Sequence, residues 1–143
     1  MDFYDELNEA NSLQASNIED IGRNQLIFNL NIGRTAENSE DIIINDMNLG
    51  PAFQIHFDNG IYEVHFKSYI CFNVINESFD ALGGDEFIGK RIRIYSKSNF
   101  LDYISNDTFA TFDYPGEFKH YSFITANHII NVITTEEPAI KKL

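Results

Sequence analysis

The sequence predicts an α+β protein built mainly from antiparallel strands, with a curled or barrel-like sheet, an N-terminal helix and one further short helix. Apolar residues recur at every second position in several short segments, and clusters of turn-forming residues separate these segments. Phe and Tyr favour strands and supply the large side chains: the chain has 13 Phe, 7 Tyr and no Trp. A chain of 143 residues fits one ordinary domain, so we expect a single domain over residues 1–143.

The first 24 residues predict the N-terminal helix. This segment is polar and acidic, and Phe3, Leu7 and Ala10 would share one face of a helix. Acidic residues such as Asp2 and Asp5 suit the positively polarised N-terminal end of a helix. A loosely ordered arm over residues 1–24 is the alternative interpretation.

The strands are expected from residue 26 onward. Apolar and more polar residues alternate over residues 26–32, which predicts a strand with one buried face. Residues 42–44 predict a second, short strand, and the turn-forming cluster at residues 45–51 would end it.

A hairpin is the most specific structural prediction. Residues 53–57 and 61–66 flank Asp58-Asn59-Gly60, and Asn-Gly is the favoured pair of a type I′ turn. A two-residue turn would pair Phe57 with Tyr62, Ile55 with Val64 and Phe53 with Phe66. All six side chains would then lie on one face, so the turn chemistry and the apolar pattern agree on one register. The second strand could run on toward Val74.

The next part of the chain predicts a loop, a strand and a helix. Residues 76–89 are rich in Gly, Asn, Asp and Ser, which indicates a loop. Residues 90–95 alternate again, with Arg91 and Arg93 pointing outward. Ser98 would cap a short helix over residues 99–104.

The last part of the chain predicts further strands. Residues 109–112 indicate one strand, and Tyr114-Pro115-Gly116 indicates a turn. Residues 118–125 and 128–134 predict a final pair of strands joined at Ala126-Asn127, with Pro138 ending the ordered pattern.

The charge balance is the most distinctive feature of the composition. Twenty-two acidic residues against ten basic residues give a net charge of −12. A surface this negative repels nucleic acid and anionic membranes, and it attracts a basic partner. We therefore expect a basic protein partner, no nucleic acid and no membrane. The simpler alternative is that the acidic residues only keep the protein soluble.

The cellular location follows from the cysteine count and the first residues. Cys71 is the single cysteine, so no internal disulfide can form, which suits a reducing compartment. The first ten residues lack the positive region and the apolar stretch of a secretory signal. No apolar run approaches the ~20 residues that a membrane helix needs. We expect a cytoplasmic protein.

One short motif matches a catalytic signature. Gly83-Gly84-Asp85-Glu86-Phe87 spells the five-residue signature of the diguanylate cyclases. That family also has a metal-binding Asp upstream and an apolar strand after the signature. Here the signature is followed by Ile88-Gly89-Lys90, and no upstream match is present. We interpret the motif as a Gly-rich surface turn that carries two solvated acids.

The predicted hairpin contains one candidate metal site. Its register places His56, Glu63 and His65 together on the polar face, with His56 opposite Glu63. Two His and one carboxylate can bind a divalent metal, and the site would suit a small-molecule or metal-binding β-domain. The simpler interpretation is a solvated His–Glu pair, so we expect no cofactor and no catalytic residues. His120 and His128 would point to opposite faces, and Cys71 would be a buried, inert thiol.

The C-terminal third resembles a known kind of protein. The segment from Phe118-Lys119-His120-Tyr121 through Asn127-His128-Ile129-Ile130 to Glu136-Glu137-Pro138-Ala139-Ile140 is similar to small acidic bacterial proteins, many of them uncharacterised and some of them immunity proteins of toxin systems. The resemblance implies a cytoplasmic, non-enzymatic protein that blocks a basic toxin by covering its active surface.

The expected contact residues combine acids and aromatics on loops. They are Asp85, Glu86, Phe87, Asp113, Tyr114 and Glu117. Exposed aromatics anchor protein contacts, and acidic side chains steer a basic partner. A structural or regulatory subunit that pairs through a sheet edge is a further alternative, and it predicts a stable oligomer.

Overall fold

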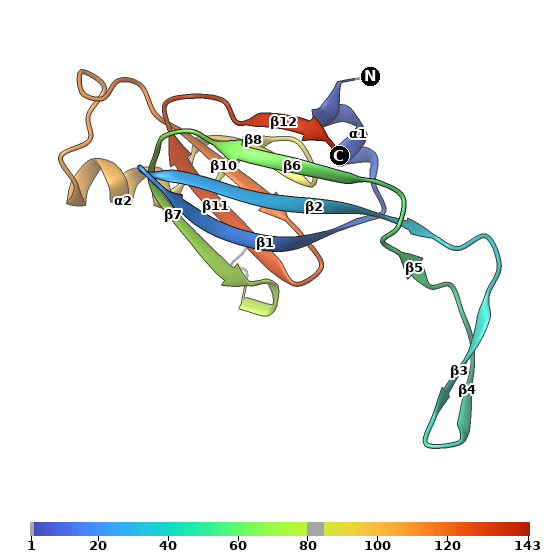
Figure 1. Ribbon diagram of the computed structural model, residues 1–143. Helices are drawn as coiled ribbons and strands as arrows, with labels where there is room; N and C mark the ends of the chain where they lie inside the picture. The colour runs from blue at the N-terminus through green and yellow to red at the C-terminus, as the bar shows by residue number, and fades with distance from the viewer. Residues whose placement is uncertain (1, 80–84) are drawn as a thin grey trace.

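The computed structural model describes residues 2–79 and 85–143 (Figure 1). The elements follow one another as α1 (Phe3–Glu9), β1 (Ser12–Gly22), β2 (Gln25–Thr35), β3 (Glu40–Ile44), β4 (Met47–Ala52), β5 (Ile55–His56), β6 (Ile61–Phe66), β7 (Tyr69–Asn76), a 3₁₀ turn (Glu77–Phe79), β8 (Glu86–Ile88), β9 (Ile92–Lys97), α2 (Asn99–Asp107), β10 (Lys119–Ile124), β11 (His128–Thr134) and β12 (Ala139–Lys142). In the described residues, no helix is long and apolar enough to cross a membrane.

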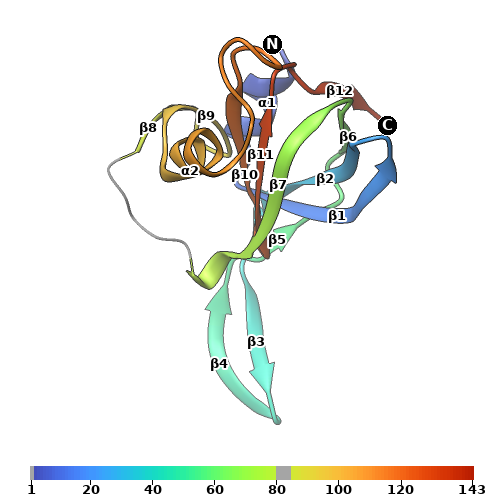
Figure 2. The same ribbon diagram turned by 90° about the vertical axis from the view of Figure 1, so that its left-hand side faces the viewer.

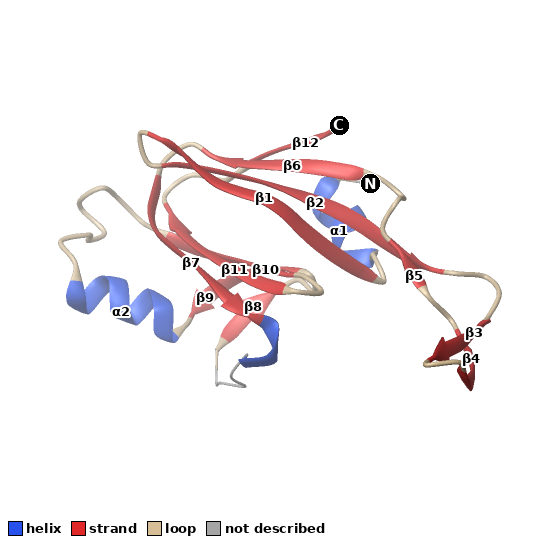
Figure 3. Ribbon diagram, turned by 60° about the horizontal axis from the view of Figure 1, so that its bottom comes forward, coloured by secondary structure: helices blue, strands red, loops and turns tan. Residues whose placement is uncertain are grey.

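Two open antiparallel sheets form the body of the molecule. The first has the strand order β1-β2-β6-β12, with β5 also paired to β2, and the second has the order β7-β11-β10-β9-β8. The sheets lie as two layers, with α2 outside the second layer (Figure 3). The α+β class and the antiparallel pairing are confirmed. The expected barrel-like closure is not found in the described strands, because each sheet ends in edge strands.

The core lies between the two sheets and is rich in aromatic rings. Phe28 of β2 meets Phe123 of β10 edge to face, with ring centroids 4.9 Å apart. Phe66 of β6 contacts Tyr121 and Phe123, also of β10, at 5.7 and 5.8 Å. Leu7 of α1 is fully buried in the same cluster. Alternate residues of each strand face inward, and together they form the core between the two sheets.

The predicted hairpin of residues 53–57 and 61–66 is wrong in its pairing. The strand β6 exists, but its neighbours are β2 and β12. Gly60 has a positive φ of 135°, whereas Asn59 does not have the positive φ that a type I′ turn needs at both positions. The pairing with β2 aligns two alternating apolar faces, one from each strand, and buries both against the second sheet. Phe53 and Ile55, which the predicted hairpin would place on the apolar face, are exposed.

Four strands lie in segments that were not expected to form strands. β1 occupies the second half of the expected helical segment, and it joins β2 through Arg23-Asn24, which both have positive φ. β4 lies inside the expected turn cluster of residues 45–51, and β12 follows Pro138. The expected strand at residues 109–112 is replaced by a single bridge between Thr111 and Pro115. The remaining strand of this kind, β8, lies within the expected loop of residues 76–89.

Several expectations are confirmed. The helix α1 begins after Asp2, whose side chain accepts a hydrogen bond from the backbone N–H of Asp5. The helix α2 begins after Ser98, whose side chain accepts from the backbone N–H of Leu101, and extends to Asp107. Strands β10 and β11 pair antiparallel around Ala126-Asn127 as expected.

Candidate partner-binding surfaces

A cavity of about 380 Å³ lies beside the edge strand β8, where β8, β9 and the start of β10 meet. Its lining residues are Glu86, Phe87, Ile88, Ile94, Tyr95, Ser96, Glu117 and Lys119. Three of the six residues expected to contact a partner, Glu86, Phe87 and Glu117, therefore share one cavity. They meet because β9 lies between β8 and β10, so residues about thirty positions apart in the sequence are brought together.

The other three expected contact residues lie outside this lining. Asp85 directly precedes β8 and is half-buried. Asp113 and Tyr114 are exposed in the turn between Thr111 and Pro115. The two glycines of the diguanylate cyclase signature, Gly83 and Gly84, lie outside the described residues.

A row of packed aromatic rings lies along one wall of the cavity. The ring of Phe87 lies 5.0 Å from that of Tyr95, and Tyr95 stacks on His120 at 4.3 Å. Phe100 of α2 meets His120 edge to face at 5.3 Å. The guanidinium of Arg93 lies 4.5 Å from the centre of the Phe87 ring. This row of rings fixes Tyr95 from behind and leaves part of Phe87 exposed.

A serine, a histidine and an asparagine form a hydrogen-bonded chain behind these rings. Ser98 Oγ lies 2.8 Å from His120 Nδ1, and His120 Nε2 lies 2.8 Å from Asn131 Oδ1. A serine that is hydrogen-bonded to a histidine base, with a third group orienting the histidine, can act as a nucleophile. Here Ser98 is only 2% exposed, and its Oγ already accepts the backbone N–H of Leu101 as the cap of α2. The arrangement therefore joins α2 to the sheet and presents no nucleophile to a substrate.

Burial and the contacts with Ser98 and Asn131 determine the protonation state of His120. Burial lowers the pKa of His120, and the hydrogen bond to Asn131 and the charge of Asp85 oppose this shift only in part. The neutral ring donates from Nε2 to Asn131 and accepts at Nδ1 from the hydroxyl of Ser98. As expected, His120 and His128 lie on opposite faces of the second sheet.

Cys71 is half-buried on β7, where it packs with the cluster under α2. Burial raises the pKa of its thiol, so the thiol is protonated at neutral pH. A protonated thiol is a poor nucleophile and a poor metal ligand.

The residues His56, Glu63 and His65 do not form the common face that the hairpin implied. Glu63 lies opposite Asn29 and Lys141, and its Oε1 is 3.4 Å from the Nζ of Lys141. His65 Nε2 is 2.8 Å from the side-chain oxygen of Gln25, whereas His56 is paired with Arg34 at the far end of β2. In residues 2–79 and 85–143, no three His, Cys, Asp or Glu side chains are placed to hold a metal.

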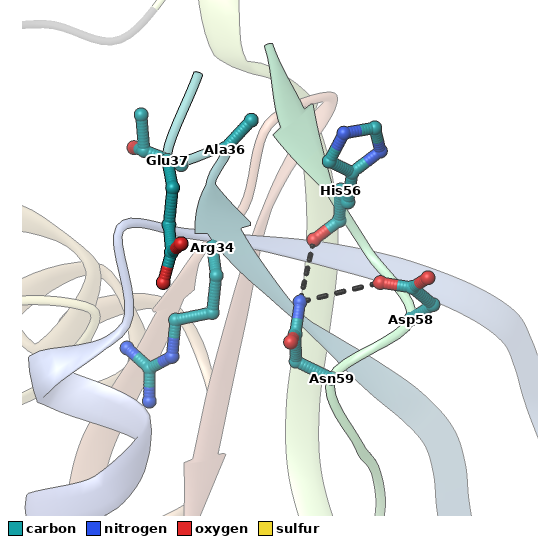
Figure 4. Close-up of a pocket in the computed structure, with 7 residues that line it drawn as sticks. Arg34, Ala36, Glu37, His56, Asp58 and Asn59 are labelled. Carbon is teal, nitrogen blue, oxygen red and sulfur yellow. Dashed lines mark hydrogen bonds between the residues drawn. The ribbon is translucent and has the colours of Figure 1, made fainter. Parts of the chain in front are cut away.

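A second, open cavity of about 410 Å³ lies where β2 ends (Figure 4). Its lining residues are Arg34, Thr35, Ala36, Glu37, His56, Asp58 and Asn59. Figure 4 shows Arg34 and Glu37 on one side of the cavity and the other labelled polar residues on the opposite side. Asn59 donates to the backbone oxygen of His56 at 3.0 Å, and Arg34 donates to the backbone oxygen of Glu9 at 3.2 Å. These polar groups hold loops in place.

The strands β3 and β4 form a two-stranded arm that projects from the body (Figures 1 and 2). We define the arm as residues 37–53. Its tip is Asn45-Asp46, with φ of 52° and 60°, which is the backbone of a type I′ turn. At its base, the backbone N–H of Ala36 donates to the oxygen of Gln54 at 2.7 Å.

The arm has one apolar face. The pairing of Ile44 with Met47 places them on the same side as Ile42 and Leu49, because side chains alternate along each strand. All four side chains are exposed, Ile44 by 54% and Met47 by 62%. The opposite face carries Ile43 and a hydrogen-bonded pair, Asn48 and Asp41. We call the first set, Ile42, Ile44, Met47 and Leu49, the apolar face of the arm.

The apolar face of the arm is not among the surfaces predicted from the sequence. Two short apolar segments flank Asn45-Asp46, and this pattern was a usable signal for a hairpin. The surroundings of the arm are acidic: from residue 36 to residue 66 the chain has no Lys or Arg. The acidic residues in that interval are Glu37, Glu40, Asp41, Asp46, Asp58 and Glu63.

Comparison with known proteins gives no relative. No family model, no curated protein and no solved structure matches the chain.

Proposed function

We propose that the protein is a non-catalytic binding protein of the immunity type, which blocks a basic protein partner such as a bacterial toxin. The observation that carries this proposal is the cavity beside β8, which joins the carboxylates of Glu86 and Glu117 to the rings of Phe87 and Tyr95. Acidic groups next to partly exposed rings are the combination that binds a basic side chain.

A lysine or arginine side chain of the partner suits the cavity. Its aliphatic stem would lie against Ile88 and Ile94, and its charged head would reach the carboxylates. Within the described part of the chain, neither Glu86 nor Glu117 takes part in an ion pair. Lys119 stands at the same lining, so the cavity itself carries two acidic groups and one basic group.

The charge of the whole protein supports a basic partner. A net charge of −12 speeds the encounter with a positively charged protein and slows the encounter with nucleic acid. The exposed aromatics Phe112 and Tyr114, in the loop between α2 and β10, would add contact area to the interface. The burial of Ser98 supports a role without catalysis.

The test begins with capture of the partner. The tagged protein is exposed to a lysate of the source cells at low salt and then washed at rising salt, and the captured protein is identified and purified. Its affinity is measured by calorimetry for the wild type, for Glu86→Lys/Glu117→Lys and for Glu19→Lys/Glu136→Lys. The last variant changes the net charge equally at exposed acids away from the cavity.

We expect a basic partner whose affinity falls about 100-fold in Glu86→Lys/Glu117→Lys, since each lost charge contact at a close interface costs a factor of about ten or more. The matched control should lose about threefold or less, which reflects only long-range attraction. Equal losses of affinity in the two variants would show that the cavity is not part of the interface. An acidic or neutral partner would contradict the proposed function.

A further inference from the structure

The arm is an exposed apolar element outside the cavity region. Two-stranded hairpins on their own are at best marginally stable in water, and they become stable when other elements cover an apolar face. The arm has no such cover in the described structure, because its apolar face belongs to neither core cluster. Exposed apolar patches of this kind mark contact sites.

We propose that the apolar face of the arm docks into an apolar groove on the basic protein partner. This inference rests on the proposed function, and it adds a contact surface that is separate from the cavity beside β8. Figures 1 and 3 show the arm at the opposite end of the molecule from α2 and the adjoining loop. One partner would therefore be held both at the cavity and at the arm.

Charge complementarity identifies the occupant. A partner that covers Ile44 and Met47 also meets the acids that flank them, and no Lys or Arg lies between residues 36 and 66. A second copy of this chain would bring Glu40, Asp41 and Asp46 against the same acids, and like charges brought together at an interface are unfavourable. A groove with an apolar floor and basic rims satisfies both features of the arm.

The two faces of the arm determine which substitutions test the proposal and which serve as the control. Ile44→Ser/Met47→Ser changes the apolar face, whereas Ile43→Ser changes an isoleucine that is 65% exposed on the opposite face. Neither substitution touches the core between the sheets. Amide resonances outside the arm therefore report whether each variant keeps the wild-type fold.

The probe is a short peptide of alternating Leu and Lys, which has one apolar and one basic face as a strand. A matched peptide of alternating Leu and Glu lacks the basic face, and a matched peptide of alternating Ser and Lys lacks the apolar face. Each peptide is titrated onto the isotope-labelled full chain, and chemical shifts are followed. We expect the Leu–Lys peptide to shift the amides of β3 and β4 and to bind at least about tenfold more tightly than the other two, because only it matches both features.

The variants separate the possible outcomes. Affinity for the Leu–Lys peptide should fall about tenfold or more in Ile44→Ser/Met47→Ser and stay within about twofold in Ile43→Ser, because only the first loses buried apolar area. Equal binding by all three proteins, or shifts confined to residues outside the arm, would overturn the proposal. Sedimentation that shows a dimer lost in Ile44→Ser/Met47→Ser would also overturn it and make a second copy the occupant.

The proposed function and the docking of the arm can fail separately. The variant Glu86→Lys/Glu117→Lys should still bind the Leu–Lys peptide at the arm, since none of the residues that line the cavity belongs to the arm. If this variant loses affinity for the natural partner but keeps its affinity for the peptide, the result supports the cavity contact independently of the arm. Once the partner is purified, a photo-cross-linking residue at Met47 should join it to the arm.

Discussion

Asn8 shows how a single polar side chain joins distant parts of this chain. Its Oδ1 accepts hydrogen bonds from the backbone N–H groups of Lys90, Arg91 and Ile92 at 2.7 to 2.9 Å. Gly89, which begins this tight loop, has a φ of 94°, and a Cβ there would lie 1.9 Å from the oxygen of Ile92. A glycine and an asparagine separated by eighty residues thus fasten α1 to the start of β9.

His120 has a comparable role at the other end of the second sheet. The neutral ring joins Ser98, at the start of α2, to Asn131 of β11. It also packs between the rings of Tyr95 and Phe100. A protonated ring would donate at both nitrogens, and the contact with Ser98 would then have to reorganise.

Acid should therefore destabilise the protein through His120. The ordinary pKa of the ring is 6.5, and burial lowers the pKa in the folded state. Below 6.5 the unfolded chain binds more protons than the folded chain, so the free energy of unfolding is highest above 6.5 and falls as the pH drops toward the folded pKa. Urea unfolding from pH 7.5 down to about 5, above the carboxylate range, measures this loss.

His120→Gln is the matched variant for this measurement, since glutamine does not titrate and keeps a donor and an acceptor. Its unfolding free energy should vary less with pH between about 5 and 7 than that of the wild type. Asp85→Asn should lower the pKa of His120 further, because the charge of Asp85 raises it. An NMR titration that places the pKa of His120 above 6.5 would contradict this account.

At the level of elements, the arm and the body are held by different interactions. The body strands β2, β6, β10 and β11 bury apolar side chains on facing surfaces. The arm is joined to them through the end of β2 and the hydrogen bond between Ala36 and Gln54. The fold of the body should therefore not depend on the arm.

Excision of the arm tests this independence. Residues 37–53 are replaced by Asn-Gly, so that the Ala36–Gln54 contact closes a type I′ hairpin. We expect the free energy of unfolding in urea to change by less than about 1 kcal/mol, because surface segments without core contacts rarely contribute more. A loss of several kcal/mol would show that the arm stabilises the body.

At the level of the whole molecule, one aromatic cluster holds the two sheets together. Phe123 of β10 contacts Phe28 of β2 and Phe66 of β6, and all three side chains are fully buried. The chain has no internal disulfide to assist it. The stability of the domain depends on how well these rings fill the space between the sheets.

Phe123→Ala should lower the free energy of unfolding by about 3–5 kcal/mol, because it leaves a cavity between the sheets that the backbone cannot close. Phe109→Ala is the matched control, since Phe109 is 99% exposed, and it should change stability by about 0.5 kcal/mol or less. Thermal and urea unfolding of both variants measure the difference. Similar losses in the two variants would place the principal core elsewhere.

Local patterns were sufficient for much of this fold. The alternation over residues 26–32, the cap at Ser98 and the pair of strands around Ala126-Asn127 each depend on neighbours in the sequence, and each is confirmed. Glu86, Phe87 and Glu117, which were chosen for residue type and turn context, line one cavity, and their contact with a partner stays a prediction. Their assembly into one cavity was not predictable, since it requires the order β10-β9-β8.

The sequence by itself determined the strand-rich α+β class, the identity of most of the strands and helices, and the acidic character of the surface. Tertiary structure alone decided the partners of β6 and the placement of Glu86 and Glu117 at one cavity. It also decided the separation of His56 from Glu63 and the exposure of the arm. The physical reason is that strand pairing is chosen by the total apolar area that two sheets can bury, which is a property of the whole chain. A favourable Asn-Gly turn is worth less than the burial of the facing surfaces of β2 and β6.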